Sequence, residues 1–193
     1  SMADRVRDKV AIVFGAGQTP GETIGNGRAT AVLLASEGAK VLVVDRDAKS
    51  AEDTVDLIRA KGGEAQAFVA DVVSEAQVKA AVEACASEYG RIDILHNNAA
   101  DLAVTRRDGD IGQMDVEVWD RIFRVNVRGT MLMCKYVLPH MVRQKSGSII
   151  NTASALGLQG AVVQAAYAAS KAAEIQMCRS IAASHGKRGV RCN

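Results

Sequence analysis

Tyr167 and Lys171 are the two residues whose types and spacing best suit proton transfer. They stand four positions apart in a Tyr-Ala-Ala-Ser-Lys segment, and in a helix this spacing places both side chains on one face. A free tyrosine has a pKa of about 10, so it is a poor base at neutral pH until a nearby cation favours the phenolate. Lys171 can supply that cation. Because such pairs also arise by chance on exposed helices, the interpretation needs support from other residues.

Two more polar residues could complete an acid/base site. Ser154 lies 13 positions before Tyr167, just past an apolar run that predicts a strand, so its hydroxyl could meet the phenol. Asn126 stands inside a long helical stretch, where an amide side chain competes with backbone hydrogen bonds. A local kink that holds the amide inward would explain Asn126, and a surface-facing Asn is the alternative.

A glycine-rich segment offers a different chemistry, the binding of phosphate. It follows the first predicted strand and leads into the first predicted helix. Glycines there let the backbone pass close to a pyrophosphate and direct free N–H groups at it from a helix N-terminus. A merely flexible loop is the alternative. The candidate contacts in this segment are Gly15, Gly25, Asn26 and Gly27.

The ends of the next strands carry further candidates. Asp45 lies 18 residues past Gly27, and a carboxylate there can bind both ribose hydroxyls of an adenosine while repelling a 2′-phosphate. This favours NAD over NADP, with an ordinary helix cap or loop acid as the alternative. Asn side chains at such ends can tie adjacent strands together, and small residues let the backbone approach a flat ring. The residues at the third and fourth strand ends are Asp71, Val72, Asn97, Asn98, Ala99 and Ala100.

The segments that must position these residues show two alternating patterns of apolar residues, one typical of strands and one typical of helices. Short apolar runs predict buried strands, and amphipathic stretches between them predict helices. In the first helix, Ala29, Val32, Leu33 and Ser36 are expected to share one side, and the third begins with a capping-box signal at Ser74 and Gln77. The predicted strands are 10–14, 41–44, 65–69, 92–95 and 148–152, with a possible sixth from Val190; the helices include 26–37, 47–61, 115–144 and 162–185.

Such alternation requires parallel pairing, so the predicted fold is α/β, a doubly wound parallel sheet of the Rossmann type. We expect a single domain over residues 10–193, preceded by a polar segment, 1–9, in which Ser1 before Met2 is typical of a cloning scar. In such sheets ligands bind outside the carboxyl ends of the strands. Apart from Asn126, the candidate residues follow those ends or lie on the last helix.

Composition excludes several classes of protein. The 193 residues include 24 Lys+Arg and 22 Asp+Glu, a formal net charge of +2, which gives no long-range field for nucleic acid or anionic lipid. No apolar run approaches about 18 residues, so neither a membrane span nor a signal peptide is expected. The 4 cysteines lack metal-binding spacing and predict buried, reduced thiols in a cytoplasmic protein without a metal.

Together these motifs resemble the short-chain dehydrogenase/reductase family, from Val10 to Asn193. The resemblance implies hydride transfer between NAD and a small alcohol or ketone, with Tyr167 as the general acid/base. It implies that Ser154 orients the substrate oxygen, that Lys171 binds the nicotinamide ribose and favours the phenolate, and that Asn126 holds a relay water. Asp71, Val72 and Asn98 would surround the adenosine. A homotetramer or homodimer is expected from the same resemblance.

The sequence departs from the family pattern in three places. About six residues are inserted in the glycine-rich turn, so that residues 18–24 could form a flap and the identity of the phosphate-binding glycines stays open. Ala100 stands where members of the family commonly have a glycine. The chain stops at Asn193, where the sixth strand of the family begins, which predicts that the substrate lid and last strand are missing. Two alternative functions therefore stand: an NADPH-linked 3-oxoacyl reductase and a non-catalytic cofactor-binding or assembly fragment.

Overall fold

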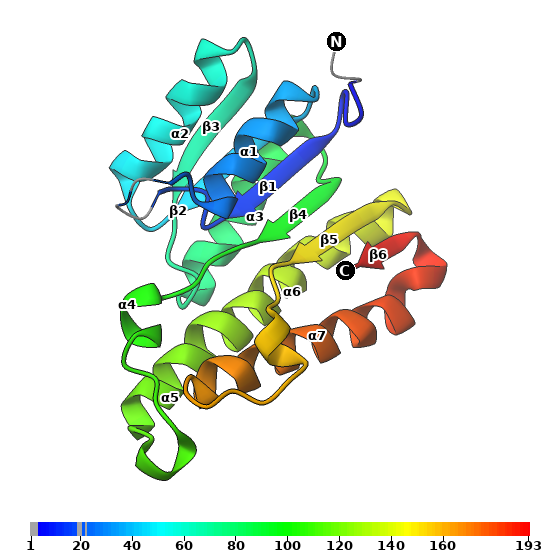
Figure 1. The fold of residues 1–193 in the computed structure, drawn as a ribbon. Helices are drawn as coiled ribbons and strands as arrows, with labels where there is room; N and C mark the ends of the chain where they lie inside the picture. Colours follow the sequence, from blue (N-terminus) through cyan, green and yellow to red (C-terminus); the bar gives the residue numbers. More distant parts are fainter. Residues whose placement is uncertain (1–3, 19–20, 22) are drawn as a thin grey trace.

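The chain folds around one six-stranded parallel sheet (Figure 1). A computed structural model describes residues 4–18, 21 and 23–193; Ser1 and Met2, with the predicted cloning scar, lie outside this range. The strand order is β3-β2-β1-β4-β5-β6, and every neighbouring pair is parallel. The strands are β1 (Val10–Phe14), β2 (Lys40–Asp45), β3 (Glu64–Val69), β4 (Ile94–Asn97), β5 (Gly147–Asn151) and β6 (Val190–Cys192).

Helices connect successive strands, as the alternating pattern predicts. The long ones are α1 (Asn26–Ser36), α2 (Ala48–Ala60), α3 (Glu75–Tyr89), α6 (Thr130–Gln144) and α7 (Ala165–His185). Shorter helical segments are α4 (Leu102–Thr105), η1 (Ile111–Gln113), α5 (Val116–Ile122), η2 (Phe123–Gly129), η3 (Ala155–Gly157) and η4 (Gly186–Arg188). The prediction of a doubly wound parallel α/β sheet is confirmed. Its strand order reverses between β1 and β4, which opens a crevice at their carboxyl ends.

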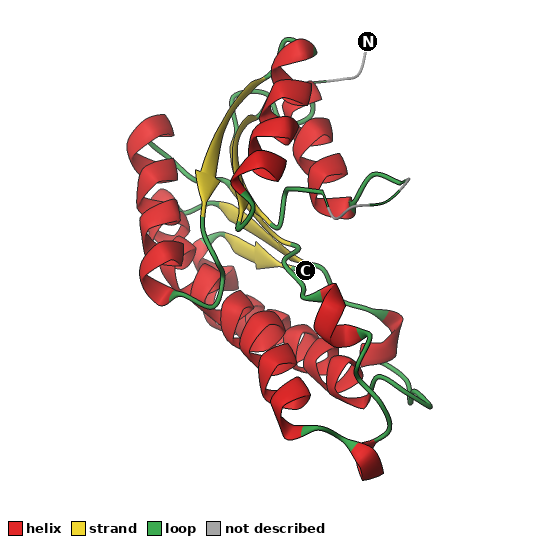
Figure 2. Cartoon of the chain, turned by 90° about the vertical axis from the view of Figure 1, so that its left-hand side faces the viewer, coloured by secondary structure: helices red, strands yellow, loops and turns green. Residues whose placement is uncertain are grey.

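The two faces of the sheet bury separate sets of apolar side chains, and Figure 2 shows helices on both sides of the strands. In β1, Val10, Ile12 and Phe14 pack in one cluster with residues of α3, α6 and α7. The alternate residues Ala11 and Val13 pack in a second cluster with residues of α1 and α2. Because both faces of β1 are covered, its run of five apolar residues is continuous rather than alternating.

The side of α1 that carries Ala29, Val32, Leu33 and Ser36 is not its buried side. The buried residues are Gly27, Ala31 and Ala35, whereas Leu33 is 47% exposed. Apolar and polar residues are both spread around this helix, so hydrophobicity alone does not select the buried face. Its smallest side chains face the sheet because they allow the closest approach of the helix backbone.

The predicted helix over 115–144 is one helical segment interrupted in its middle. Between α5 and α6 the seven residues of η2 form a π-helix. A π-helical turn changes the direction of its side chains relative to an α-helix and is frequent at functional sites. The helix is therefore irregular around Asn126, where the sequence predicts a kink.

Other boundaries shift by two or three residues. The strand predicted from residue 92 begins at Ile94. The N–H of Ile92 donates to the Gln144 side chain at 3.0 Å and not to a neighbouring strand. Helix α7 begins at Ala165, after Gln164 in the left-handed conformation with φ of 67°. One half of the capping box predicted at Ser74 and Gln77 is present, because the Ser74 hydroxyl accepts the Gln77 N–H at 3.4 Å. In place of the other half, the Gln77 side chain accepts the N–H of Asp71 at 2.8 Å.

All four cysteines are free thiols, with Cys85, Cys134 and Cys192 buried and Cys178 partly exposed. Burial raises the pKa of Cys85 and of Cys134 to about 12. Across residues 4–18, 21 and 23–193, no helix combines the length and apolar character needed to cross a membrane.

Candidate active site

A cavity of about 420 Å³ lies at the carboxyl ends of the strands. It is lined by the turns that follow β1, β2, β3 and β4 and by the first turns of α1 and α7. All eleven candidate cofactor contacts line it: Gly15, Gly25, Asn26, Gly27, Asp45, Asp71, Val72, Asn98, Ala99, Tyr167 and Lys171. Residues far apart in the sequence thus meet in one place, as the strand-end argument predicts.

The glycine-rich turn packs tightly against the start of α1. A Cβ atom on Gly27 would collide with the carbonyl oxygen of Gly15, so this approach requires a glycine. Gly25 is the N-cap of α1 and provides no side chain; no acidic residue stands in the first turn of this helix, all of whose residues are described. The first N–H groups of a helix lack partners within the helix, so this end of α1 suits an anion such as a pyrophosphate.

The inserted part of the turn is tied together by Gln18. Its side-chain amide donates to the carbonyl of Thr23 at 2.7 Å, and its carbonyl oxygen accepts the N–H of Gly25 at 2.7 Å. Gly15, Gly17, Gly25 and Gly27 all line the cavity. The predicted flap falls partly on residues 19, 20 and 22, which lie outside the described residues.

Asp45 connects β2 to the glycine-rich turn. One carboxylate oxygen accepts the N–H of Gly17 at 2.8 Å and the other accepts the N–H of Asp47 at 3.0 Å. The carboxylate thus lies at the cavity wall, held in place by the backbone. Each oxygen retains a lone pair with which it can accept a further hydrogen bond.

Beside Asp45 lies a charged group that the sequence did not indicate. Asp101 accepts from Arg121 at 3.1 Å and lies 3.7 Å from the guanidinium of Arg46; all three residues line the cavity. Burial alone would raise the pKa of Asp101, but the hydrogen bonds from Arg121 and from the Val104 N–H, with the two guanidinium charges, lower it.

Asparagines tie the central strand ends together, as predicted. The Asn97 amide donates to the Asn151 side chain at 2.7 Å, which links β4 to β5. The Asn98 amide donates to the Gly15 carbonyl at 3.3 Å, and the Asn98 oxygen accepts from Thr152 at 3.2 Å. These contacts fix the edge of the cavity nearest to α7.

Tyr167 and Lys171 lie on one face of α7, as their spacing predicts. The Lys171 ammonium is 5.6 Å from the centroid of the Tyr167 ring. It also donates to the carbonyl of Thr152 at 2.6 Å and to the two carboxylate oxygens of Glu174 at 3.0 and 3.2 Å. Lys171 is 4% exposed and Glu174 only 2%. Burial raises the pKa of Glu174 to about 7, against the opposing effect of Lys171.

Asn126 faces inward from the π-helix and is 1% exposed, so the surface-facing alternative is wrong. Its amide donates to the Ser170 hydroxyl at 3.0 Å, and this hydroxyl donates to the carbonyl of Tyr167 at 2.7 Å. Asn126 is thereby connected to the helix turn that carries Tyr167.

Ser154 follows β5 and caps η3, where its hydroxyl accepts the N–H of Leu156 at 3.2 Å. This short helix packs on α7 so closely that a Cβ on Gly157 would lie 2.8 Å from the carbonyl carbon of Lys171. Ser154 is therefore brought to the part of α7 that carries Lys171. The lining of the cavity described above includes neither Ser154 nor Asn126.

Sequence reasoning missed Glu174, Ser170 and the Asp101 ion pairs. Glu174 had a detectable signal, because a carboxylate three residues after Lys171 falls on the same helix face. No such signal in the sequence indicated Arg46 and Arg121 as partners of Asp101, since the three residues come from separate elements. Within the described ranges, no three His, Cys, Asp or Glu side chains gather where they could hold a metal ion.

Known proteins resemble this chain in sequence and in fold over nearly its whole length. A family model described as short chain dehydrogenase matches residues 9–193. A putative short-chain dehydrogenase/reductase from Burkholderia xenovorans is 41% identical, with a TM-score of 0.89 over 98% of this chain and 71% of that one. NAD+-bound xylitol dehydrogenase is 33% identical, with a TM-score of 0.88 over 98% and 69% of the two chains.

Among curated relatives, the 3-oxoacyl-[acyl-carrier-protein] reductase of Thermotoga maritima is 35% identical over 98% of this chain and 73% of that protein. The chain spans about two thirds of the length of the first curated relatives that it matches. The family model nevertheless covers nearly every residue of the chain, and the solved relatives share its sheet and helices. The chain belongs to the short-chain dehydrogenase family.

Proposed function

We propose that the protein is an NAD-dependent oxidoreductase that transfers hydride between the nicotinamide and an alcohol or carbonyl substrate. One observation carries the proposal: Tyr167 and Lys171 line the same cavity as the glycine-rich turn and Asp45. A phenol next to an ammonium group is thereby placed beside a cradle suited to a dinucleotide.

Each residue of the site has its own role in the proposed reaction. Bound in the cavity, NAD would supply the hydride acceptor during oxidation of an alcohol. The phenolate of Tyr167 takes the proton of the substrate hydroxyl, and the charge of Lys171 stabilises that phenolate. Ser154 holds the substrate oxygen, and Asn126 fixes the turn of α7 through Ser170. Asp45 holds the adenosine ribose, while Asp71, Val72, Asn98 and Ala99 face the adenosine half.

NAD rather than NADP is the proposed cofactor because of Asp45. A 2′-phosphate would lie against its carboxylate, and like charges at hydrogen-bonding distance repel. The similarity to an NAD+-bound xylitol dehydrogenase supports this choice.

An NADPH-linked 3-oxoacyl reductase is the second candidate. Arg46 lines the cavity next to Asp45, and a guanidinium is well suited to a phosphate. The relative from Thermotoga maritima carries the name of that activity. Comparing kcat/KM for NAD and NADP, and for NADH and NADPH, separates the two candidates.

The test of the proposal is a panel of alcohols and ketones assayed with both cofactors through the absorbance of the reduced nicotinamide. Cofactor-dependent turnover of a member of the panel is expected. Cofactor binding without turnover of any member would favour the non-catalytic binding or assembly module instead.

We also propose a homodimer or homotetramer and a cytoplasmic location. Exposed apolar side chains on α5 and α6, Val116 at 69% and Met131 at 40%, support self-association. The four free thiols support a reducing compartment. Light scattering of the purified protein measures the oligomeric state directly. A monomeric mass would contradict the proposed homodimer or homotetramer.

A further inference from the structure

Helix α7 begins without a cap of its own. Its N-cap residue, Gln164, is in the left-handed conformation and makes no side-chain hydrogen bond to the helix. The first N–H groups of α7 bond instead to a segment some 60 residues earlier in the chain. Ala165 donates to the carbonyl of Gly109 at 3.1 Å, Ala166 to one carboxylate oxygen of Asp108 at 3.2 Å, and Tyr167 to the other at 2.7 Å.

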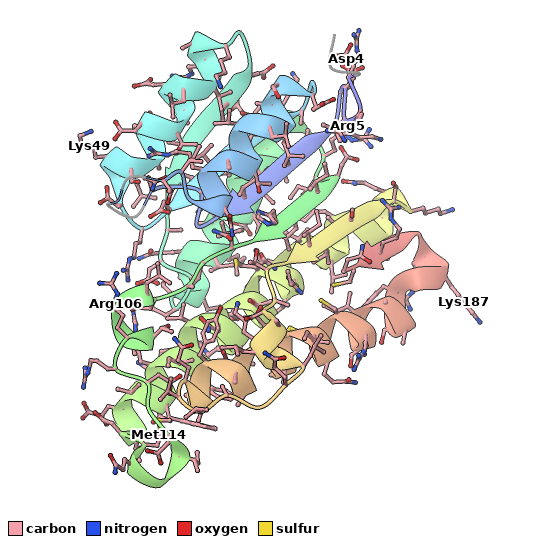
Figure 3. The ribbon with its side chains drawn as sticks, viewed as in Figure 1. Asp4, Arg5, Lys49, Arg106, Met114 and Lys187 are labelled. Atoms are coloured by element: carbon pink, nitrogen blue, oxygen red, sulfur yellow. The ribbon has the colours of Figure 1, made fainter. Side chains whose placement is uncertain are left out.

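Asp108 is a buried residue, only 6% exposed, in the segment between α4 and η1. Figure 3 shows the nearby Arg106 pointing away from the protein. Asp108 is buried instead, and its carboxylate accepts the N–H of Tyr167 in α7. A buried carboxylate is costly unless it is hydrogen-bonded. Here both oxygens are bonded to the positive end of a helix, which compensates that cost.

The position of Asp108 is fixed by α4. Its N–H donates to the carbonyl of Thr105 at 3.2 Å, and the Thr105 hydroxyl donates to the carbonyl of Asp101 at 2.9 Å. Asp101 is itself held by Arg121 at 3.1 Å. The cap of α7 is therefore anchored to the wall of the cavity rather than to a freely moving loop.

We propose that Asp108 is a positioning residue for Tyr167, which it holds at the active site through the backbone N–H of that tyrosine. This inference rests on the proposed function, in which Tyr167 is the acid/base. The first turn of a helix frays when its N–H groups lack partners, and fraying would displace the phenol. Lys171 lies one turn further on and is held separately by Thr152 and Glu174.

This separation makes the role testable. Loss of Asp108 should displace Tyr167 while Lys171 and the rest of the cofactor cavity keep their contacts. A displacement of about 1 Å at a reacting group can cost about 100-fold in rate. We therefore expect Asp108→Ala to lower kcat by about 10- to 100-fold and to change the affinity for the cofactor by less than about 3-fold.

Asp108→Asn provides the rescue. Its amide oxygen can still accept the N–H of Tyr167, whereas its NH₂ group cannot accept that of Ala166. We expect kcat between those of wild type and Asp108→Ala. Asp110→Ala is the matched control, because Asp110 lies in the same segment but is exposed and caps η1 through the N–H of Gly112 at 2.8 Å. It should retain the kcat of wild type.

The experiment measures kcat, KM, cofactor affinity by titration and amide hydrogen exchange at residues 166–168 in all four proteins. Faster exchange and lower kcat in Asp108→Ala, with cofactor affinity kept and partial rescue by Asn, support the proposal. An Asp108→Ala protein with the kcat of wild type would overturn it. So would a parallel loss of kcat and cofactor affinity that Asn does not rescue, since a merely structural role predicts that result. An inactive wild type would refute the proposed function instead.

Discussion

The buried pair of Lys171 and Glu174 is the least expected feature at the scale of single residues. Their side chains touch at 3.0 Å, and both are nearly inaccessible to solvent. A buried ion pair of this kind loses solvation that its mutual attraction only partly restores. The carboxyl group responds with a raised pKa, which makes Glu174 a titrating group near neutral pH.

That titration predicts how stability depends on pH. The pKa of Glu174 is about 7 in the folded chain, above its ordinary value of 4.5, so between these values the folded state binds the proton more strongly. Its contribution to the free energy of unfolding is complete below pH about 4.5 and is lost as the pH rises through about 7, by on the order of 3 kcal/mol. Urea unfolding at several pH values should show this decline in wild type but not in Glu174→Gln.

Glu52→Gln provides the control for that comparison, because Glu52 is an exposed carboxylate on α2. It should show the same pH dependence of unfolding as wild type. Equal slopes in wild type and Glu174→Gln would contradict the raised pKa.

Asp45 carries the prediction on cofactor choice. Asp45→Ala removes the carboxylate that would bind the ribose hydroxyls and repel a 2′-phosphate, and it leaves Arg46 beside the cavity. We expect the ratio of kcat/KM for NAD to that for NADP to fall by about 10- to 100-fold, since one charge-assisted contact is worth about 1.5–3 kcal/mol. Asp53→Ala, at a partly exposed carboxylate of α2 that pairs with Lys49, should leave the ratio unchanged. An unchanged ratio in Asp45→Ala would exclude Asp45 as the selecting residue.

Residues of the site were predictable where local spacing determines their position. Tyr167 and Lys171 follow from helix periodicity, and Asp45 follows from its place at a strand end. Asp108 and Ser170 were not predictable as contacts, because their partners are 59 and 44 residues away in the chain. No local pattern encodes which distant N–H group a loop carboxylate will meet.

At the scale of elements, the junction of β1 with α1 is the contact least tolerant of change. Gly27→Ala places a methyl group against the Gly15 carbonyl, which would move the first turn of α1 away from the cavity. We expect a loss of about 1–3 kcal/mol in the free energy of unfolding and weaker cofactor binding. Gly186→Ala is the control, because its Cβ meets nothing within 4 Å. Full cofactor affinity in Gly27→Ala would show that this close approach is not needed.

The elements themselves were largely predictable, and the errors have physical causes. Periodicity placed the strands and long helices within a few residues. It did not indicate the buried side of α1, where small residues rather than large apolar ones face the sheet. It also could not foresee α4 and η1, whose short turns are capped by the side chains of Asp101 and Asp110.

At the scale of the whole molecule, the parallel sheet gathers the site. The carboxyl ends of β1 to β4 lie on one edge, so turns spread from Gly15 to Ala99 share a cavity. This arrangement was predictable because alternating strands and helices permit few topologies. The positions of Ser154 and Asn126 depend on how η3 and the π-helix pack on α7, and such packing of irregular segments is not encoded by periodicity.

Tyr167 is the proposed acid/base of a nicotinamide-dependent reaction, and the substitution Tyr167→Phe tests this role. The matched control is Tyr136→Phe, which removes a phenol hydroxyl bonded to Glu75 at 2.7 Å, outside the cavity. We predict that Tyr167→Phe binds the cofactor as wild type does but loses about 100- to 10,000-fold in kcat, while Tyr136→Phe keeps its activity. A Tyr167→Phe protein that turns over substrate within a few-fold of wild type would contradict the assignment.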